Sequence, residues 1–207
     1  MRTRAALAGL AFAGALACQS GVFAGHREVS GLWRLVPAES TITFVGIKNN
    51  AVGVPGSFAT LEGDFDAAKR TGFVEVKLGS TETGNPARDE NIRAQFFEAV
   101  KFPVARFDVT GLPAPETLPA PGASARFDLA GTLQLHGTSL PLKVNARVSR
   151  DGQNHLHVHN SAPIVLSAHD LGMDAQLAAL KATCGHESLS GAIPVEIDLA
   201  FAPVAVD

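Results

Sequence analysis

Apolar and polar residues alternate with a period of two through most of this chain. The pattern is clearest over 127–135, 140–148 and 193–201, where every second residue is apolar or small. Because successive side chains of a strand point to opposite faces, each run predicts a half-buried β-strand. The apolar rows contain no acid, base or nucleophile. A sheet built from these strands therefore has one apolar face, and a ligand that binds to that face is expected to be apolar.

Shorter strands with the same alternation are expected over 40–48, 61–65 and 73–78, separated by turns rich in Gly, Asn and Asp. Short strands at near-regular spacing favour an antiparallel barrel or sandwich. A chain of 207 residues that is 46% hydrophobic can bury a core of its own, and it favours one domain over two. The proline-rich segment 113–125 is expected to be a loop without regular structure or function.

The first of two helical segments follows the strand that ends near residue 78. Asn85-Pro86 or Asp89 can start this helix, where acidic residues favour its positive end. Ile92 and Phe96 lie four residues apart and therefore share one face. The pattern predicts a short helix that leads back into a strand over 104–110.

The second helical segment follows Asp170, which is a good cap, and ends at Gly185. Its apolar stripe over 173–180 continues to Cys184, which predicts a buried thiol that packs as a small hydrophobic group. Cys184 and His186 also support an alternative, because a thiolate and an imidazole two residues apart could hold copper, zinc or haem iron. The stripe favours the buried thiol, and a metal or haem site remains the alternative.

Three histidines, His155, His157 and His159, alternate with apolar residues and share one strand face. Neighbours on that face lie about 6.6 Å apart, so two of them could share Zn²⁺ or Cu²⁺. No carboxylate or thiol follows at a spacing typical of metal sites. We therefore favour a solvated outer strand face next to a turn at Asp151-Gly152.

The first 24 residues have the features of a secretory signal peptide. Two arginines precede an apolar run that is too short to cross a bilayer as a helix, and small residues follow at Val22-Phe23-Ala24. The sequence therefore predicts a signal peptide over 1–24, a mature domain over 25–207 and an exported bacterial protein. A lipoprotein whose lipid is attached to Cys18 is the alternative.

The composition and the motif search argue against two large classes of function. The formal net charge is −3, and the basic residues are scattered rather than gathered in the patch expected of a nucleic-acid-binding protein. The sequence contains no G-x-S-x-G, H-E-x-x-H or C-x-x-C motif and no glycine-rich phosphate loop. We therefore expect a binding protein without catalytic residues or a required cofactor, rather than an enzyme.

Several segments, in order and spacing, resemble the YceI-like family of bacterial exported proteins. They are WRLVPAESTITFVGIK, GSFATLEGDFD, TETGNPARDENIRAQFFEAVKFPVARF (which ends at Phe107), AGTLQLHGTSLPLKV and AIPVEIDLAF. The resemblance covers roughly 32–202. It implies a lipocalin-like antiparallel β-barrel of about eight strands with two short helices, a periplasmic location and a bound isoprenoid lipid, either a polyprenyl chain or an isoprenoid quinone. It also implies a homodimer. The predicted helix over 170–185 departs from the commonest family pattern.

The expected ligand contacts are the apolar residues that face the barrel interior. They are Phe44, Phe58, Val76, Phe97, Phe102, Phe107, Leu133 and Leu142. Burying ten methylene-sized groups of a lipid tail contributes on the order of 8 kcal/mol. Two rival hypotheses remain: a metal- or haem-binding redox protein with a membrane-associated electron-transfer partner, and a filled barrel that acts through protein contacts.

Overall fold

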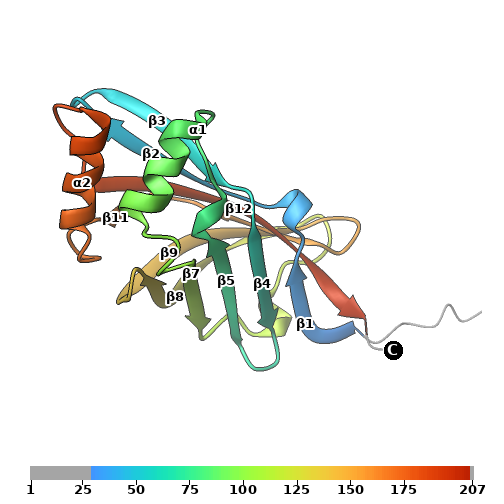
Figure 1. The fold of residues 1–207 in the computed structure, drawn as a ribbon. Helices are drawn as coiled ribbons and strands as arrows, with labels where there is room; N and C mark the ends of the chain where they lie inside the picture. The colour runs from blue at the N-terminus through green and yellow to red at the C-terminus, as the bar shows by residue number, and fades with distance from the viewer. Residues whose placement is uncertain (1–28, 206–207) are drawn as a thin grey trace, which may run out of the picture.

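The computed structural model describes residues 29–205, which form a single antiparallel β-sheet with helices at one end (Figure 1). The predicted signal peptide and Cys18 lie outside the described residues. The strands are β1 (Val29–Leu35), β2 (Thr41–Lys48), β3 (Val52–Phe58), β4 (Leu61–Asp66), β5 (Thr71–Lys77), β6 (Thr81–Glu82), β7 (Val104–Thr110), β8 (Ser124–Leu135), β9 (Thr138–Arg150), β10 (Leu156–Asn160), β11 (Ile164–Ser167) and β12 (Ala192–Ala205). Within this range no helix is long and apolar enough to cross a membrane.

Eight of these strands close into a barrel. They pair in the order β1-β4-β5-β7-β8-β9-β10-β12, and β12 then pairs with β1, where Leu35 lies opposite Phe201. All of these pairs are antiparallel, and closure leaves no free sheet edge around the ring. The alternating pattern left a barrel or a sandwich open, and the antiparallel barrel implied by the family resemblance is confirmed.

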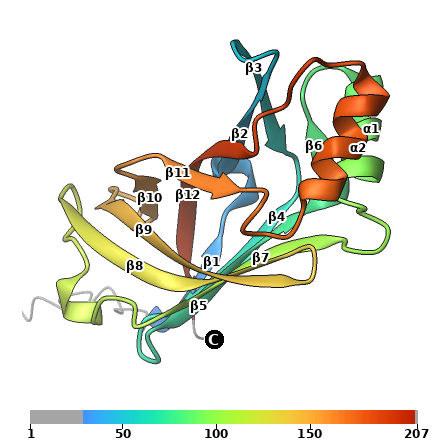
Figure 2. The ribbon, with the colours of Figure 1, turned by 90° about the vertical axis from the view of Figure 1, so that its left-hand side faces the viewer.

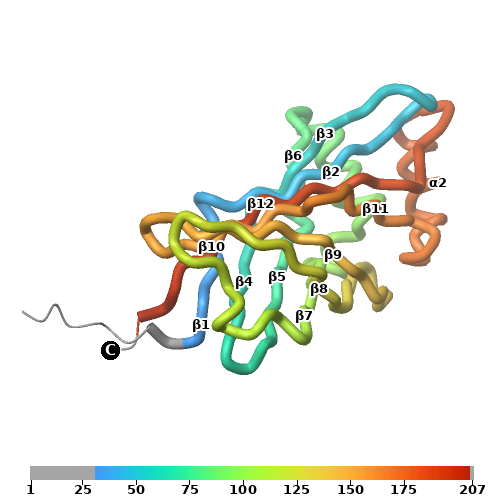
Figure 3. Tube along the Cα trace, turned by 180° about the vertical axis from the view of Figure 1, so that it is seen from behind, coloured from blue at the N-terminus to red at the C-terminus, as the bar shows by residue number. Residues whose placement is uncertain are grey.

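The long strand β12 belongs to the barrel and to an extension of it. Its second half pairs with β10 and β1, and its first half pairs with β2, where Val195 lies opposite Phe44. Seen from behind, this first half lies between β2 and β11 (Figure 3). The strands β3 and β6 continue the sheet beyond β2. The sheet therefore rises past the barrel on one side.

Two helices stand side by side at the end of the barrel from which the β2–β3 hairpin rises (Figure 2). The first is α1 (Pro86–Asn91), and the side chain of Asn85 caps it by accepting a hydrogen bond from the Arg88 N–H at 3.0 Å. A π-helical segment, Ile92–Phe96, continues it and buries Ile92 and Phe96. This agrees with the predicted helix and its apolar face.

The second helix, α2 (Asp174–Cys184), starts later than the sequence suggests. The expectation that Asp170 caps it is wrong, because Met173 occupies the N-cap position and makes no side-chain cap bond. Asp170 instead lies in the preceding turn, where its N–H donates to the Ser167 hydroxyl at 3.2 Å. The predicted end is confirmed, because Gly185 terminates the helix in the left-handed conformation at φ 64°.

The segment predicted to be a plain loop contains regular structure at both ends. Pro115–Thr117 forms a 3₁₀ turn, as Pro37–Glu39 and Leu78–Ser80 do elsewhere, and β8 begins at Ser124. Leu118 packs against the core. The loop therefore covers part of the barrel end where β7 has stopped and β8 continues.

Candidate binding cavity

The barrel encloses a cavity of about 310 Å³. All but two of the residues that line it are apolar or glycine. The two exceptions, Asp64 and Ser190, have partners: the Asp64 carboxylate accepts a bond from Arg34 at 3.2 Å, and the Ser190 hydroxyl donates to the Ala192 carbonyl at 3.1 Å. Both polar side chains of the wall already form hydrogen bonds within the protein and need none from a ligand. The cavity therefore suits an apolar molecule.

Two kinds of element build the wall. Alternate residues of the barrel strands point inward, as the period-two pattern requires, and include Val144 and Val148 of β9. At the helical end, Phe96 of the π-helical segment and Leu177 and Leu180 of α2 complete the lining. The helical segments therefore form part of the cavity wall as well as covering one end of the barrel.

Two glycines each leave room for an aromatic ring at the cavity wall. Phe44 lies opposite Gly56 across β2 and β3, and a Cβ placed on Gly56 would overlap the Phe44 ring. Phe107 lies over Gly131 in the same way, since a Cβ there would come within 2.7 Å of the Phe107 ring. Without side chains beneath them, both rings sink toward the sheet and leave the interior open.

Most of the predicted contact residues lie on the cavity wall, and their contact with a lipid stays a prediction. The residues on the wall are Phe44, Phe58, Val76, Phe97, Phe107, Leu133 and Leu142. Phe102 is placed elsewhere: its ring centroid lies 4.2 Å from that of His136, and the Lys101 ammonium lies 4.8 Å above the Phe102 ring. The turn at Glu98, whose φ is 46°, redirects the chain ahead of Phe102.

Other wall residues were not predicted as ligand contacts. Leu177 and Leu180 were assigned only to the buried stripe of a helix, and the same spacing could have identified them as wall residues. Pro113 and Leu118 also line the cavity, although they belong to the segment 113–125 that is expected to have no function, and so does Leu112, which immediately precedes that segment. Their position depends on where β7 ends, which no local pattern shows.

A polar cluster fastens α2 beside the cavity. One Glu98 carboxylate oxygen lies 2.7 Å from His136 Nε2 and accepts a hydrogen bond from the Gln176 amide at 3.0 Å. The Gln176 bond, followed by the His136 bond, lowers the pKa of Glu98. Glu98 thus links the helix that carries Leu177 and Leu180 to the turn between β8 and β9.

Cys184 and His186 do not form a metal centre in the described part of the chain. The Cys184 sulfur is half-buried and lies 3.8 Å from the Asn91 amide nitrogen. His186 follows the helix end, where its N–H donates to the Lys181 carbonyl at 3.1 Å. Residues 29–205 contain no group of three or more His, Cys, Asp and Glu side chains placed to hold a metal ion.

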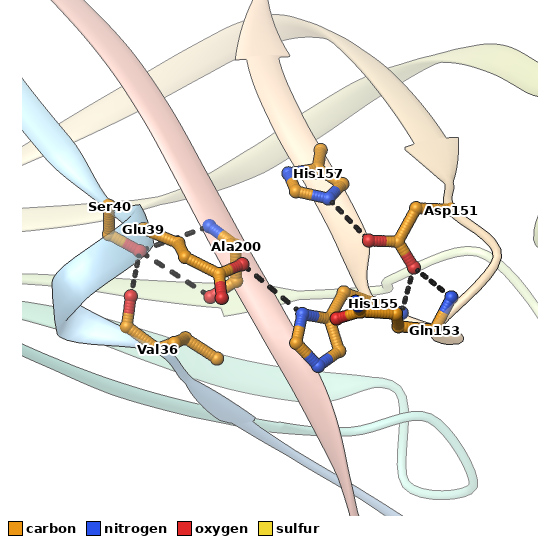
Figure 4. Close-up of polar contacts among 8 residues, drawn as sticks. All are labelled: Val36, Glu39, Ser40, Asp151, Gln153, His155, His157 and Ala200. Atoms are coloured by element: carbon orange, nitrogen blue, oxygen red, sulfur yellow. Dashed lines mark hydrogen bonds and ion pairs between the residues drawn. The ribbon is translucent and has the colours of Figure 1, made fainter.

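The three alternating histidines each face a different carboxylate on the outer side of the barrel. His155 Nδ1 lies 3.2 Å from Glu39, and His157 Nε2 lies 3.1 Å from Asp151 (Figure 4). Asp151 also accepts bonds from the backbone N–H groups of Gln153 and His155. The His157 bond, with these two, lowers the pKa of Asp151. The arrangement is one of separate histidine–carboxylate contacts, with no carboxylate shared between two of the histidines.

Sequence comparison matches most of this chain to one family. The profile of the YceI-like domain matches residues 33–201. A UPF0312 protein of Pseudomonas fluorescens is 32% identical over 149 residues, which cover 68% of this chain and 74% of that relative. A UPF0312 protein of Azotobacter vinelandii is 30% identical over 129 residues, which cover 58% of this chain and only 64% of that relative.

Solved structures with the same fold include two bacterial proteins. A polyisoprenoid-binding domain from Saccharophagus degradans, implicated in plant cell wall breakdown, superimposes with a TM-score of 0.77 at 24% identity and covers 86% of this chain and 100% of that domain. Burkholderia cenocepacia BcnA gives a TM-score of 0.61 at 16% identity over 80% of this chain and 98% of BcnA. At these identities the likeness establishes the fold.

Proposed function

Because the chain belongs to the YceI-like domain family, we propose that it binds an isoprenoid lipid, either a polyprenyl chain or an isoprenoid quinone, inside the barrel. The observation that carries the proposal is the apolar cavity, in which neither polar wall residue lacks a partner. A hydrocarbon chain requires no polar contact, and it gains free energy from each carbon that leaves water. The similar domain from Saccharophagus degradans is described as polyisoprenoid-binding, which supports the same class of ligand.

The cavity volume limits how much of such a chain is enclosed. An apolar cavity of about 150 Å³ accommodates benzene, or about 25 Å³ per carbon. On that scale 310 Å³ holds about twelve carbons. These carbons amount to between two and three isoprene units, so the rest of a longer chain would leave the barrel through an open end.

The number of enclosed carbons also sets an upper limit on the binding free energy. Burying about twelve carbons at about 0.8 kcal/mol each gives about 10 kcal/mol before the ordering costs of binding are subtracted. A micromolar dissociation constant corresponds to about 8 kcal/mol, so binding near this strength needs no polar headgroup contact. A lipid held in this way is released unchanged, which suits a carrier or a store. We place this role in the periplasm on the strength of the predicted signal peptide.

Trp33 provides a direct assay. It is the one tryptophan of the sequence, and its ring stacks on Phe65 with centroids 5.6 Å apart, while Phe65 lines the cavity. A short-chain isoprenoid quinone in the cavity should quench Trp33 fluorescence in a saturable way, and an excess of the matching polyprenol, which does not quench, should restore it. Quenching that rises linearly with quinone, or that the polyprenol leaves unchanged, would count against binding in the barrel.

A further inference from the structure

Two arginines on the outer face of the barrel stand apart from the others in the described range. Six of the arginines in 29–205 have a hydrogen-bond, ion-pair or ring partner: Arg34, Arg70, Arg88, Arg93, Arg106 and Arg150. Arg126 and Arg147 have none among the contacts of these residues. This is unexpected in a chain whose acidic residues outnumber its basic ones by three.

The same two arginines face each other. Arg126 of β8 and Arg147 of β9 are directly opposite in the strand register, and His159 of β10 lies opposite Arg147 on the other side. Neighbouring strands lie about 4.8 Å apart, so these three side chains form one short row. Like charges placed directly opposite one another destabilise a sheet, and a bound anion would relieve that repulsion.

The row lies in a hollow on the outer surface. The hollow is lined by Ser124, Arg126, Arg147, Ser149, His159, Asn160 and Ser161. Among residues 29–205, the hydroxyl groups of Ser124, Ser149 and Ser161 form no hydrogen bond with the protein. Three hydroxyl donors beside the guanidinium groups are therefore free. The Asn160 side chain is occupied, because it accepts the Ile197 N–H and donates to the Ala162 carbonyl.

The nearest carboxylates leave the arginines available. Asp128, the next outward-facing residue of β8, accepts a hydrogen bond from the Asn145 amide. Asp198 lies 3.3 Å from His159 Nδ1 at the far end of the row. Each acid thus has a partner of its own, and neither is among the residues that line the hollow.

We propose that this hollow binds a doubly charged phosphate group. A guanidinium group presents forked N–H donors that match phosphate oxygens, and two of them on adjacent strands can hold opposite sides of one such group. The serine hydroxyls add neutral donors around it. The site lies outside the barrel and is independent of the cavity, and its ligand is either a free phosphate or pyrophosphate ion or the headgroup of a lipid.

The test is calorimetric titration of the whole mature protein with pyrophosphate at low ionic strength. We expect one ion per chain, and affinity at least tenfold weaker for Arg126→Gln and for Arg147→Gln. Lys143→Gln is the matched control, because Lys143 is an exposed cation on the same face of β9, opposite Ala130 and outside the hollow. Its affinity should remain within twofold of that of the parent protein.

Thermal unfolding gives a second readout. Because the two arginines repel each other without an anion, Arg126→Gln should melt at the same temperature as the parent protein or higher, and pyrophosphate should stabilise the parent and Lys143→Gln more than Arg126→Gln. Sedimentation with phosphatidic acid vesicles, against phosphatidylcholine vesicles, separates a headgroup from a free ion. Binding to neither pyrophosphate nor these vesicles, or equal weakening by all three substitutions, would overturn the proposal.

Discussion

Replacing Leu142 by tryptophan distinguishes a hollow barrel from a packed one. Leu142 lies in the middle of β9 opposite Gly131, lines the cavity and remains partly exposed to it. The substitution adds six heavy atoms, which fill about 150 Å³ at about 25 Å³ per atom. This is roughly half of the 310 Å³ cavity.

The expected result is a large loss of affinity with little loss of stability. Excluding about six of the twelve enclosed carbons removes about 5 kcal/mol of burial at about 0.8 kcal/mol each. Even half of that loss weakens binding by about sixtyfold. Calorimetric titration with a short-chain isoprenoid quinone gives the affinity, and urea unfolding gives the free energy of unfolding.

Lys143→Trp is the control, because residue 143 points to the outer face and is exposed. It adds the same ring to the same strand and should leave binding unchanged. Two results would refute the reasoning. One is equal affinity for Leu142→Trp and the parent protein. The other is destabilisation of Leu142→Trp by about 3 kcal/mol or more, as expected when a filled core is overpacked.

Three further substitutions test other parts of the structure. Gly56→Ala should push the Phe44 ring into the cavity, weaken quinone binding about tenfold and lower the free energy of unfolding by about 1–3 kcal/mol in urea unfolding. The folded pKa of Glu98 lies below its usual 4.5, so its contribution to stability is complete above that pH and is lost as the pH falls through the folded value. Glu98→Gln should therefore lower the free energy of unfolding at pH 6 and flatten its decline on acidification below pH 4.5, and parallel curves for the two proteins would contradict this. Asp174, 2.7 Å away, raises the pKa of His169, so Asp174→Asn should return it toward 6.5 in an NMR titration. An unchanged titration would show that this pair does not form in solution.

The strands of the barrel were predictable because each carries its own alternating pattern, whereas their closure into a barrel was implied only by the family resemblance. The alternating runs over 127–135, 140–148 and 193–201 fall within β8, β9 and β12, and each presents its apolar row to the interior. Burying one face of a strand fixes which residues point inward, whatever its neighbours are. The predicted contacts on these strands, Leu133 and Leu142, therefore lie on the wall.

The position of Phe102 and the start of α2 depend on turns that the strand and helix patterns do not show. The chain turns before Phe102 because Glu98 adopts a positive φ and its carboxylate pairs with His136, thirty-eight residues away. Asp170 has the side chain of a cap, but the turn through Gly172, whose φ is 69°, delays the helix to Asp174. The unpaired state of Arg126 and Arg147 depends in turn on strand register, which composition does not reveal.

Native mass spectrometry of the protein isolated from its own cells, followed by organic extraction, tests the central claim most directly. The account predicts a chain shortened by residues 1–24 that carries one isoprenoid molecule, released intact into the extract and rebound when added back. A lipid-free chain that also fails to take up added polyprenol or quinone would contradict it.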